Sequence, residues 1–543
     1  MRFRLVFRVL AAAALSALLC SASCSREKPG LTPGGPVSLT ATAEGYKWAV
    51  GDAVFVTLSG GGSARLEVTQ VKPTGTAVLE GALPEGKALE GVAVFPYGNY
   101  QRHAGTLSLT LPGAWEGLQD HALLGAVVSP GTAGLAFKPL GGKVVLSYEN
   151  IPSIARGAVF TSVSAPASGA FTLESGADGG LRLKSAASGG QESSVHIRFA
   201  PGDDATVTVP LPPGQYDGWS LALEDAEGKP IRYSVQRTGS LTVTPGSVFT
   251  REKVTLPKFH TAAAEKIYGF SDAVLTMYPD DVETTLSRGV TETALHFTKD
   301  GALQMHAWLI EADLSQGDNQ LVVGAPYADN TAFGKKRQTL SAQAPLYVTE
   351  TSRPTVIVNA DFWAVSGTYK DQLRGPIHTG GRILKSTFLY EERLYQQALS
   401  YAGVRIDGSL SIQPKDRYLS EQALLTECTG GGVIMLYDGE VPDLSAYPGI
   451  DPRTVIGCNG KTVYFLVVDG RQTDWSNGLN YTELGSIMKA VGCTSAVNLD
   501  GGGSAQLLVL NPETGKYEIR NRPADGKERA VAETWIISSD YAR

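Results

Sequence analysis

A glycine-rich segment near the C-terminus is the part of this sequence best suited to chemistry. Residues 498–504 read Asn-Leu-Asp-Gly-Gly-Gly-Ser and include the end of an apolar run. Consecutive glycines let the main chain adopt positive φ and approach a ligand closely, and successive N–H groups in such a turn can bind an anion. Asp500 begins the turn. The segment therefore predicts an anion-binding loop with a carboxylate at its rim.

The glycine segment does not have the pattern of a nucleotide-binding P-loop. No Lys follows the glycines, and residues 505–510 have the apolar pattern of a strand, so no helix N-terminus is available for a phosphate. A glycine-rich hairpin without a ligand has the same local pattern. Other residues must decide between the two interpretations.

Three arginines lie at the edges of other predicted strands. Arg453 belongs to a Pro-Arg-Thr segment, Arg471 to Asp-Gly-Arg and Arg522 to Asn-Arg-Pro. The planar guanidinium group can donate two parallel hydrogen bonds to one phosphate. Together with the glycine segment, these arginines predict a site for a phosphorylated substrate.

Two further aspartates follow apolar runs and could act with Asp500. Asp361 comes shortly after the run 355–358, and Asp469 directly after the run 463–468. Carboxylates in pairs can serve as acid, base or nucleophile. Asp361 and Asp469 are therefore candidates to act together with Asp500.

Two other polar residues are expected to have structural positions. Asp438 and Gly439 form a strand-end pair that we assign to a simple turn, since Asp often caps its own backbone there. His378 lies in a glycine-containing loop. We expect a surface group there, the alternative being an acid or base near the site.

Buried strands and one helix must position these residues. Apolar runs at 355–358, 433–437, 463–468 and 496–499 each lead into Asn or Asp, and their continuity indicates strands buried on both faces. Asn480 and Glu483 have capping-box spacing, an apolar stripe follows, and Gly492 is placed to end the helix. We expect an α+β domain over residues 265–543, with a mixed central sheet flanked by helices.

The N-terminal half has a different pattern. Residues 38–255 contain short apolar runs separated by turn residues, which predicts an all-β, sandwich-like region, with a split into two subdomains near residue 139. Residues 256–264 are expected to be a linker. The pattern Trp-x-x-Gly-Asp at residues 48–52, followed by Phe-Pro-Tyr at 95–97, resembles the fimbrillin-like domains of Bacteroidetes lipoproteins. For this region a spacer without a site and a binding domain both stay open.

The first residues have the features of an export signal. Arg2, Arg4 and Arg8 precede a short apolar stretch, and small residues precede Cys24, as in the lipobox of bacterial lipoproteins. We expect residues 1–24 to be a lipoprotein signal peptide, with Cys24 lipidated, and residues 25–37 to be a tether. The alternative is an ordinary secretory peptide. Lipidation predicts a protein anchored in the cell envelope, on the periplasmic or surface face of the outer membrane.

Charge and cysteine usage exclude some functions. The chain of 543 residues has a formal net charge of -7, and its basic runs are too short for a nucleic-acid footprint. Beyond the signal only Cys428, Cys458 and Cys493 remain, and their spacing matches no zinc pattern. Two of them could form a disulfide, or all three could be buried thiols.

The order of the C-terminal motifs resembles that of the phosphodiester glycosidase family. The motifs are an Asn-x-x-Phe strand end, Pro-Arg-Thr-x-x-Gly, Val-Asp-Gly-Arg, a capped helix, Asn-Leu-Asp-Gly-Gly-Gly-Ser and Asn-Arg-Pro. The family includes the lysosomal uncovering enzyme, which removes N-acetylglucosamine from a masked mannose 6-phosphate. Ala505 and Trp363 depart from the usual residues, and neither change removes a charged group.

The resemblance implies a hydrolase that cleaves a sugar from the phosphate on its anomeric carbon. The leaving group is already a stabilised phosphate monoester, so neutralising its charge matters more than protonating it. The implied catalytic residues are Asp500, as the nucleophile or the base for water, and Asp361 or Asp469 as its partner. The implied substrate-binding residues are Asn359, Arg453, Thr454, Arg471, Asn498, Gly501, Gly502, Gly503, Ser504, Asn521 and Arg522.

Two alternatives from other functional classes stay open. One is a phosphodiesterase that attacks phosphorus, with Ca²⁺ or another hard cation held by Asp361, Asp469 and Asp500. The other is a surface adhesin whose C-terminal site binds a phosphoglycan without cleaving it. The sequence makes no cofactor certain, and Ca²⁺ is the candidate it offers.

Overall fold

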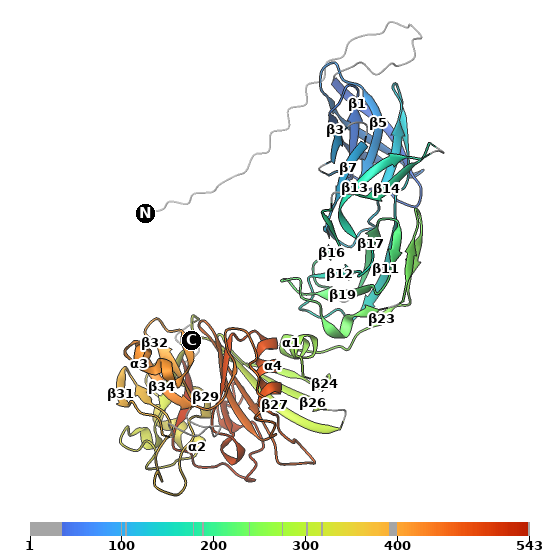
Figure 1. Ribbon diagram of the computed structural model, residues 1–543. Helices are drawn as coiled ribbons and strands as arrows, with labels where there is room; N and C mark the ends of the chain where they lie inside the picture. The colour runs from blue at the N-terminus through green and yellow to red at the C-terminus, as the bar shows by residue number, and fades with distance from the viewer. Residues whose placement is uncertain are drawn as a thin grey trace, which may run out of the picture. The chain divides into compact units, whose positions relative to one another are not determined.

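The computed structural model describes residues 35–540 apart from 99, 104–105, 177–178, 187–188, 203, 238, 274, 300–301, 317–318 and 390–398. The predicted signal peptide and Cys24 lie outside the described residues. The chain forms two compact units (Figure 1). Unit 1 comprises Met1–Thr110, Ala122–Leu140 and Phe171–Lys184, and unit 2 comprises Leu111–His121, Gly141–Ala170 and Ser185–Arg543. No helix among the described residues is long and apolar enough to cross a membrane.

Unit 1 contains a closed barrel. Strand β1 (Gly35–Ala43) pairs in parallel with β10 (Gly134–Pro139) and antiparallel with β4 (Ala77–Leu83), which closes the ring. Alternate residues of β1 are buried, as expected for a strand with one face toward a core. The other barrel strands are β2 (Ala53–Leu58), β3 (Ser63–Val71), β5 (Leu89–Phe95) and β9 (Leu124–Val128). The expectation of all-β structure is confirmed, but this part is a barrel and not a sandwich.

Further sheets complete the N-terminal half. One has the order β14 (Leu181–Ser185), β13 (Ser168–Ser175), β7 (Thr106–Leu111) and β6 (Tyr100–His103), with β15 (Gln191–Glu192) beside β13. Two others run β17 (Asp204–Leu211), β11 (Gly142–Glu149), β22 (Val248–Thr250), and β20 (Gln236–Arg237), β19 (Ser220–Glu224), β12 (Gly157–Thr161), β16 (Ser194–Arg198), β8 (Ala114–Glu116). A small pair joins β18 (Gly214–Tyr216) and β21 (Leu241–Val243). Tyr148 of β11 donates to the carbonyl of Leu221 on β19, so these two sheets face each other as in a sandwich.

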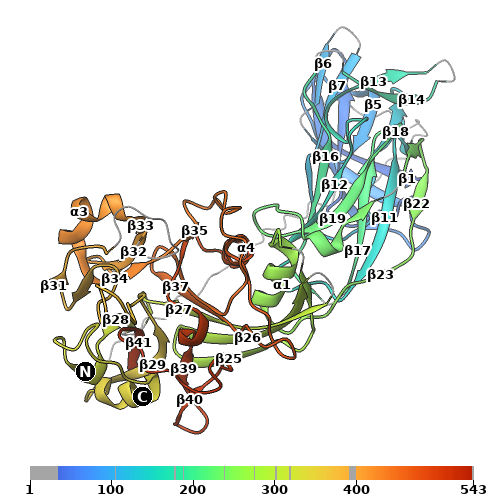
Figure 2. The same ribbon diagram turned by 60° about the horizontal axis from the view of Figure 1, so that its bottom comes forward.

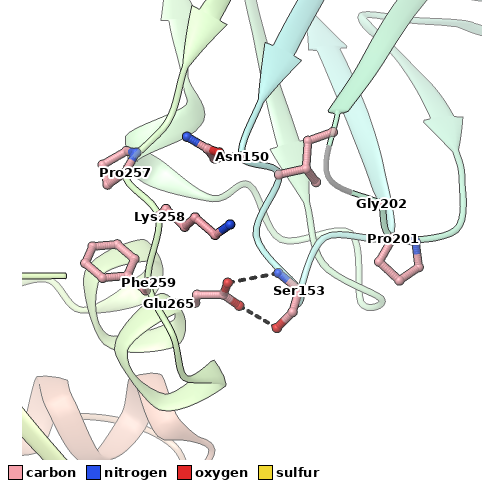
Figure 3. Close-up of a pocket in the computed structure, with 9 residues that line it drawn as sticks. Asn150, Ser153, Pro201, Gly202, Pro257, Lys258, Phe259 and Glu265 are labelled. Atoms are coloured by element: carbon pink, nitrogen blue, oxygen red, sulfur yellow. Dashed lines mark hydrogen bonds between the residues drawn. The ribbon is translucent and has the colours of Figure 1, made fainter. Parts of the chain in front are cut away.

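The segment before the C-terminal domain packs against the sandwich. Strand β23 (Val254–Thr255) pairs with β11, and Leu256 and Phe259 are buried. Helix α1 (Ala262–Phe270) begins at Thr261, whose side chain accepts from the amide of Ala264. Its Glu265 carboxylate accepts from the amide and hydroxyl of Ser153 at 3.0 and 2.7 Å (Figure 3). These contacts hold α1 to the loop between β11 and β12.

A long antiparallel sheet forms the centre of the C-terminal domain. Its order is β24 (Leu275–Met277), β26 (Val290–Lys299), β27 (Leu303–Asp313), β37 (Thr462–Val468), β36 (Arg453–Asn459), β38 (Ser495–Asn498) and β35 (Ile434–Leu436), with β25 (Val282–Ser287) beside β26. Along β37, Phe465 and Val467 face one core while Leu466 and Val468 face another. The sheet is therefore buried on both faces, as its continuous apolar runs predict.

Helices cover only one face of this sheet. Helix α1 and helix α4 (Tyr481–Val491) pack together, with Ser271 and Ser486 hydroxyls 3.1 Å apart, and both contribute to the core on that face (Figure 1). The other face packs on a second sheet with the order β28 (Gln320–Gly324), β41 (Thr534–Asp540), β29 (Ser352–Asn359), β39 (Leu507–Leu510) and β40 (Tyr517–Ile519). The central sheet was expected to be flanked by helices, but it has helices on one face and the second sheet on the other. Helix α2 (Leu340–Gln343) covers the far side of that second sheet.

A third sheet completes the domain, and it lies with helix α3 (Tyr418–Glu421) in Figure 2. Its order is β31 (Arg382–Lys385), β30 (Ile377–Thr379), β34 (Leu425–Gly431), β32 (Ser400–Arg405) and β33 (Leu410–Pro414). Every described strand pair in the three sheets of this domain is antiparallel. The expectation of a mixed sheet is wrong, because short connections and returning strands replace the crossovers that parallel pairs need.

The local predictions near the site are confirmed. The four predicted apolar runs are β29, β35, β37 and β38. Helix α4 has Asn480 as its N-cap with a full capping box to Glu483, and Gly492 ends it at φ 110°. Asp438 has φ 49° in an exposed turn, as assigned.

Candidate active site

At one edge of the two facing sheets, the C-terminal ends of some strands lie beside the N-terminal ends of their neighbours. The end of β37 lies beside the start of β36, since Val468 pairs with Arg453. The end of β29 lies beside the start of β41, since Asn359 pairs with Thr534. Antiparallel pairing therefore brings residues from both kinds of terminus to the same place.

Asn359 connects the two sheets at this end. Its Nδ2 donates to the carbonyl oxygen of Asp500 at 2.6 Å, and its Oδ1 accepts from Thr454 Oγ1 at 2.7 Å and from the amide of Gln506 at 3.2 Å. The side chain is buried and its bonds fix β29, β36 and the glycine loop relative to one another. Asn359 and Thr454, both predicted to bind substrate, thus bond to each other and hold the two sheets together.

Asp500 begins the glycine loop and is held on both sides. Its amide donates to the Ala360 carbonyl at 2.9 Å, and its Oδ1 accepts from the amide of Gly501 at 2.9 Å. Burial raises the pKa of Asp500 to about 6, against the lowering effect of the Ser504 hydroxyl, the Gly501 amide and the charges of Arg529 and Arg374. A pKa in this range suits a group that must be ionised near neutral pH and still exchange a proton.

Two glycines of the loop face arginines. A Cβ on Gly502 would contact both Arg471 terminal nitrogens at 3.0 Å, and one on Gly503 would overlap the guanidinium of Arg529. Gly502 also has φ 60°. A Cβ on Gly501 would instead overlap the Pro452 carbonyl oxygen, with Arg453 Cδ at 3.8 Å. Gly502 and Gly503 therefore give two guanidinium groups room to approach the main chain beside Asp500.

The amides of the loop are already engaged. Gly501 donates to Asp500 Oδ1, Gly502 to the Pro452 carbonyl at 2.9 Å, and Ser504 to the Gly501 carbonyl at 3.1 Å. The expected anion-binding nest of backbone amides is therefore wrong for these three groups. Positive charge for an anion comes from the arginine side chains.

The arginines differ in exposure. Arg453 is 4% exposed, donates to Tyr481 Oη at 2.9 Å and to the Gly449 carbonyl at 3.1 Å, and lies 4.3 Å from the Tyr481 ring centroid. The side chain of Arg471 is 54% exposed and its Nε donates to Asp451 at 2.7 Å. Arg471 thus meets solvent, whereas Arg453 acts from behind the loop.

Asp361 lies in a tight, buried position. It is 2% exposed, and its oxygens accept from the amides of Phe362 at 2.7 Å and Gly375 at 2.6 Å. A Cβ at Gly430 would overlap the carboxylate. Burial raises the pKa of Asp361 to about 6, the charge of Asp500 adds to this, and Lys385 opposes it. The structure therefore brings Asp361 and Asp500 into electrostatic contact.

Asp469 has a different environment. It is 1% exposed and accepts from Trp475 Nε1 at 2.8 Å, Asn521 Nδ2 at 2.9 Å and the amide of Arg522 at 2.8 Å. Both of its oxygens are engaged, so Asp469 orients the segment of Asn521 and Arg522. The side chain of Arg522 is 55% exposed and lies 3.8 Å from Asp474.

Asn498 and Ser504 complete the predicted set. Asn498 is buried and its Nδ2 donates to Tyr481 Oη at 3.3 Å, which links it to the hydroxyl that Arg453 also contacts. Ser504 Oγ accepts from Arg529 Nη1 at 3.3 Å. Both residues therefore support the charged groups around the loop.

Four charged residues of the site escape the sequence prediction. Arg529 and Arg374 act on Asp500 through their charges. Lys385 donates to the carbonyls of Leu373, Gly375 and Thr387 and acts on Asp361. Glu533 is buried and accepts from the amide of Asp361 at 3.3 Å.

Comparison with known proteins bears on this same segment. Residues 352–538 match the family model described as phosphodiester glycosidase. The C-terminal part of the chain contains a phosphodiester glycosidase domain. The matched range includes all the predicted C-terminal site residues and the four that the sequence prediction missed.

Individual relatives are distant. The SPbeta prophage-derived uncharacterized protein YomE of Bacillus subtilis is 26% identical over 215 residues, which are 37% of this chain and 30% of that protein's length. The zebrafish N-acetylglucosamine-1-phosphodiester alpha-N-acetylglucosaminidase catalytic domain, auto-inhibited by its pro-peptide, has 19% identity and TM-score 0.34 over 47% of this chain and 87% of its own. A putative cell adhesion protein from Bacteroides ovatus has 14% identity and TM-score 0.26 over 41% and 92%.

His378 and the cysteines of the phosphodiester glycosidase domain are structural. His378 is buried on β30, where its Nε2 lies 2.7 Å from Tyr418 Oη and its Nδ1 lies 3.3 Å from the Leu425 carbonyl. The expectation of a surface group is wrong because Tyr418 of α3 and Leu425 of β34 cover the ring. Cys428, Cys458 and Cys493 are buried free thiols, the second of the two alternatives.

The structure does not gather a metal site in the phosphodiester glycosidase domain. Among the residues described, no group of three or more His, Cys, Asp or Glu side chains is placed to hold an ion. Asp361, Asp469 and Asp500 are the set considered for Ca²⁺, and the oxygens of Asp469 already accept three N–H donors. That set does not fit a cation as arranged.

A surface cavity of about 330 Å³ lies elsewhere, where α1 begins (Figure 3). Asn150, Ser153, Pro257, Lys258 and Glu265 are among its lining residues. Its buried carboxylate, Glu265, has both oxygens engaged by Ser153 and the amide of Ile154. The cavity therefore has the features of a packing junction and not of a reaction site.

Proposed function

We propose that the phosphodiester glycosidase domain hydrolyses glycosyl phosphodiesters, with water replacing the phosphate at the anomeric carbon. The observation that carries this proposal is the glycine loop, where Arg471 approaches Gly502 and Arg529 approaches Gly503 beside Asp500, whose pKa is about 6. A cationic end suits the phosphate, and a carboxylate beside it suits the sugar.

On the phosphate side, the arginines neutralise the leaving group. Arg471 and Arg529 are the more exposed and contact the phosphate oxygens, while buried Arg453 adds charge from behind Gly501. Stabilising this charge as the bond to carbon breaks lowers the barrier without a strong acid. Arg522, on the segment that Asp469 holds, extends the cationic surface.

On the sugar side, Asp500 is the reacting carboxylate. It is the nucleophile at the anomeric carbon or the base for water, since Asp361 and Asp469 are more deeply buried and their oxygens are engaged. Asp361 is the partner carboxylate behind Asp500, held in place by the amides of Phe362 and Gly375. Asn359, Asn498 and Thr454 keep the geometry.

Hydrolysis in oxygen-18 water tests this proposal. The substrates are a panel of hexose and N-acetylhexosamine 1-(methyl phosphates), with the products analysed by mass spectrometry. Cleavage at carbon puts the label in the sugar. Label in methyl phosphate shows attack at phosphorus and supports the phosphodiesterase alternative, and binding without turnover supports the adhesin alternative.

A lipid anchor would place the domain at the cell envelope, with the N-terminal β region as its spacer. Cys24→Ala should abolish labelling by a palmitate analogue in growing cells, because the acyl chains attach to that residue. Cys20→Ala is the matched control and should keep full labelling. Undiminished labelling of Cys24→Ala would assign the sequence to another kind of signal.

A further inference from the structure

A group of three charged side chains, of which Asp361 and Glu533 are buried, lies behind the loop on three different elements. Asp361 follows β29, Glu533 precedes β41 and Lys385 ends β31. The amide of Asp361 donates to Glu533 Oε2, and Lys385 Nζ donates to the carbonyl of Gly375, whose amide holds Asp361. The three are therefore one connected group.

The carboxyl groups of Asp361 and Glu533 accept unequal numbers of hydrogen bonds. The oxygens of Asp361 each accept a short hydrogen bond from a backbone amide. Glu533 is 1% exposed and accepts one bond of 3.3 Å, and within the described part of the chain no donor reaches its Oε1. An anion without donors is costly to bury, so a single proton in this pair goes to Glu533.

We infer that Glu533 is a positioning residue that stays protonated at neutral pH and thereby keeps the Lys385–Asp361–Glu533 group neutral. Lys385 then balances the Asp361 carboxylate, and no second negative charge opposes the ionisation of Asp500. This inference deepens the proposed function. The protonation state of Glu533 does not depend on that function, but the expected effect on the kinetics does.

The surrounding titratable groups agree with this assignment. Burial and the Asp361 charge both raise the pKa of Glu533. Cys428 of β34 lies near both carboxyl groups, and burial raises its pKa well above the usual range, so it adds no charge. On the Asp500 side the neighbouring charges are those of Arg529, Arg374 and Arg471.

Infrared difference spectroscopy of the full chain tests the assignment without substrate. The carbonyl stretch of a protonated carboxylic acid should be present in the wild type at pH 7, absent from the matching position in Glu533→Gln, and retained in Asp361→Asn. Glu440→Gln, at a carboxyl that is 83% exposed, supplies the baseline for losing one surface carboxylate. Loss of the acid band in Asp361→Asn would put the proton on Asp361 and overturn the inference, even if Glu533→Gln does not fold.

Kinetics give the second measurement. Gln resembles a protonated Glu, so Glu533→Gln should keep kcat/KM within about threefold at pH 7, and its rate relative to the wild type should rise by up to tenfold per pH unit once Glu533 ionises. If kcat/KM of Glu533→Gln and of the wild type changed with pH in the same way, the inference would be overturned. An acid band that behaves as expected in a protein that cleaves none of the sugar phosphodiesters would reject the proposed function and keep the assignment of Glu533.

Discussion

Asp500→Asn should lower kcat by about a thousandfold, the scale of losing an essential charged group from an active site. Asn keeps the shape and can still accept from the Gly501 amide through Oδ1, so the loop should keep its conformation. Steady-state kinetics on the sugar phosphodiester that the wild type cleaves fastest would measure the change.

The same requirement for an ionised carboxylate predicts that wild-type kcat/KM falls as the pH drops through about 6, where Asp500 takes up its proton.

Asp438→Asn is the matched control for this substitution. Asp438 also precedes a glycine at a strand end, but it lies in an exposed turn and should keep full activity. Thermal unfolding of both variants separates a catalytic loss from a folding defect. A folded Asp500→Asn with more than about a tenth of wild-type kcat has lost less than about 1.4 kcal/mol, and the catalytic role would then pass to another carboxylate.

Arg471→Lys should raise KM by about five- to 150-fold, with a smaller change in kcat. Lys keeps the charge but loses the fork that lies over Gly502 and reaches Asp451, and a charge-assisted hydrogen bond contributes about 1 to 3 kcal/mol. Arg382→Lys on β31, an exposed arginine outside the site, controls for the general effect of the change. Equal KM values for Arg471→Lys and the wild type would remove Arg471 from the phosphate site.

The parts of the site that sequence predicts well depend on local patterns. The capping box of α4 and the apolar runs before Asp361, Asp469 and Asp500 are short-range signals, and the structure has each of them in place. Asn359 also lies where its strand-end position suggests, with three hydrogen bonds that hold the site together.

Glu533 and Arg529, two of the missed residues, have a common physical reason. A search of strand ends finds residues that gather in a parallel sheet, but antiparallel pairing also places strand starts at the same edge. Glu533 lies directly before β41, whose first residue pairs with Asn359 at the end of β29. Arg529 lies a few residues earlier in the chain. An acidic residue directly before an apolar strand was the available signal for Glu533.

The glycines show a second limit of sequence analysis. The three glycines predict that another group approaches the main chain closely, and in the structure Arg471 approaches Gly502 and Arg529 approaches Gly503. Both arginines belong to other segments of the chain, so spacing alone could not identify them.

Strand β41 is the last strand of this domain to be synthesised, although it lies between two strands that are made much earlier. It pairs with β28 on one side and β29 on the other, although it follows them by about two hundred residues of chain. During synthesis both earlier strands are therefore made long before the strand that separates them, and their edges stay open to wrong partners. A chain stopped before Glu533 would lack β41 and leave the edges of β28 and β29 unpaired, so ribosomal stalling or proteolysis at this point should yield aggregates and not a partly active enzyme.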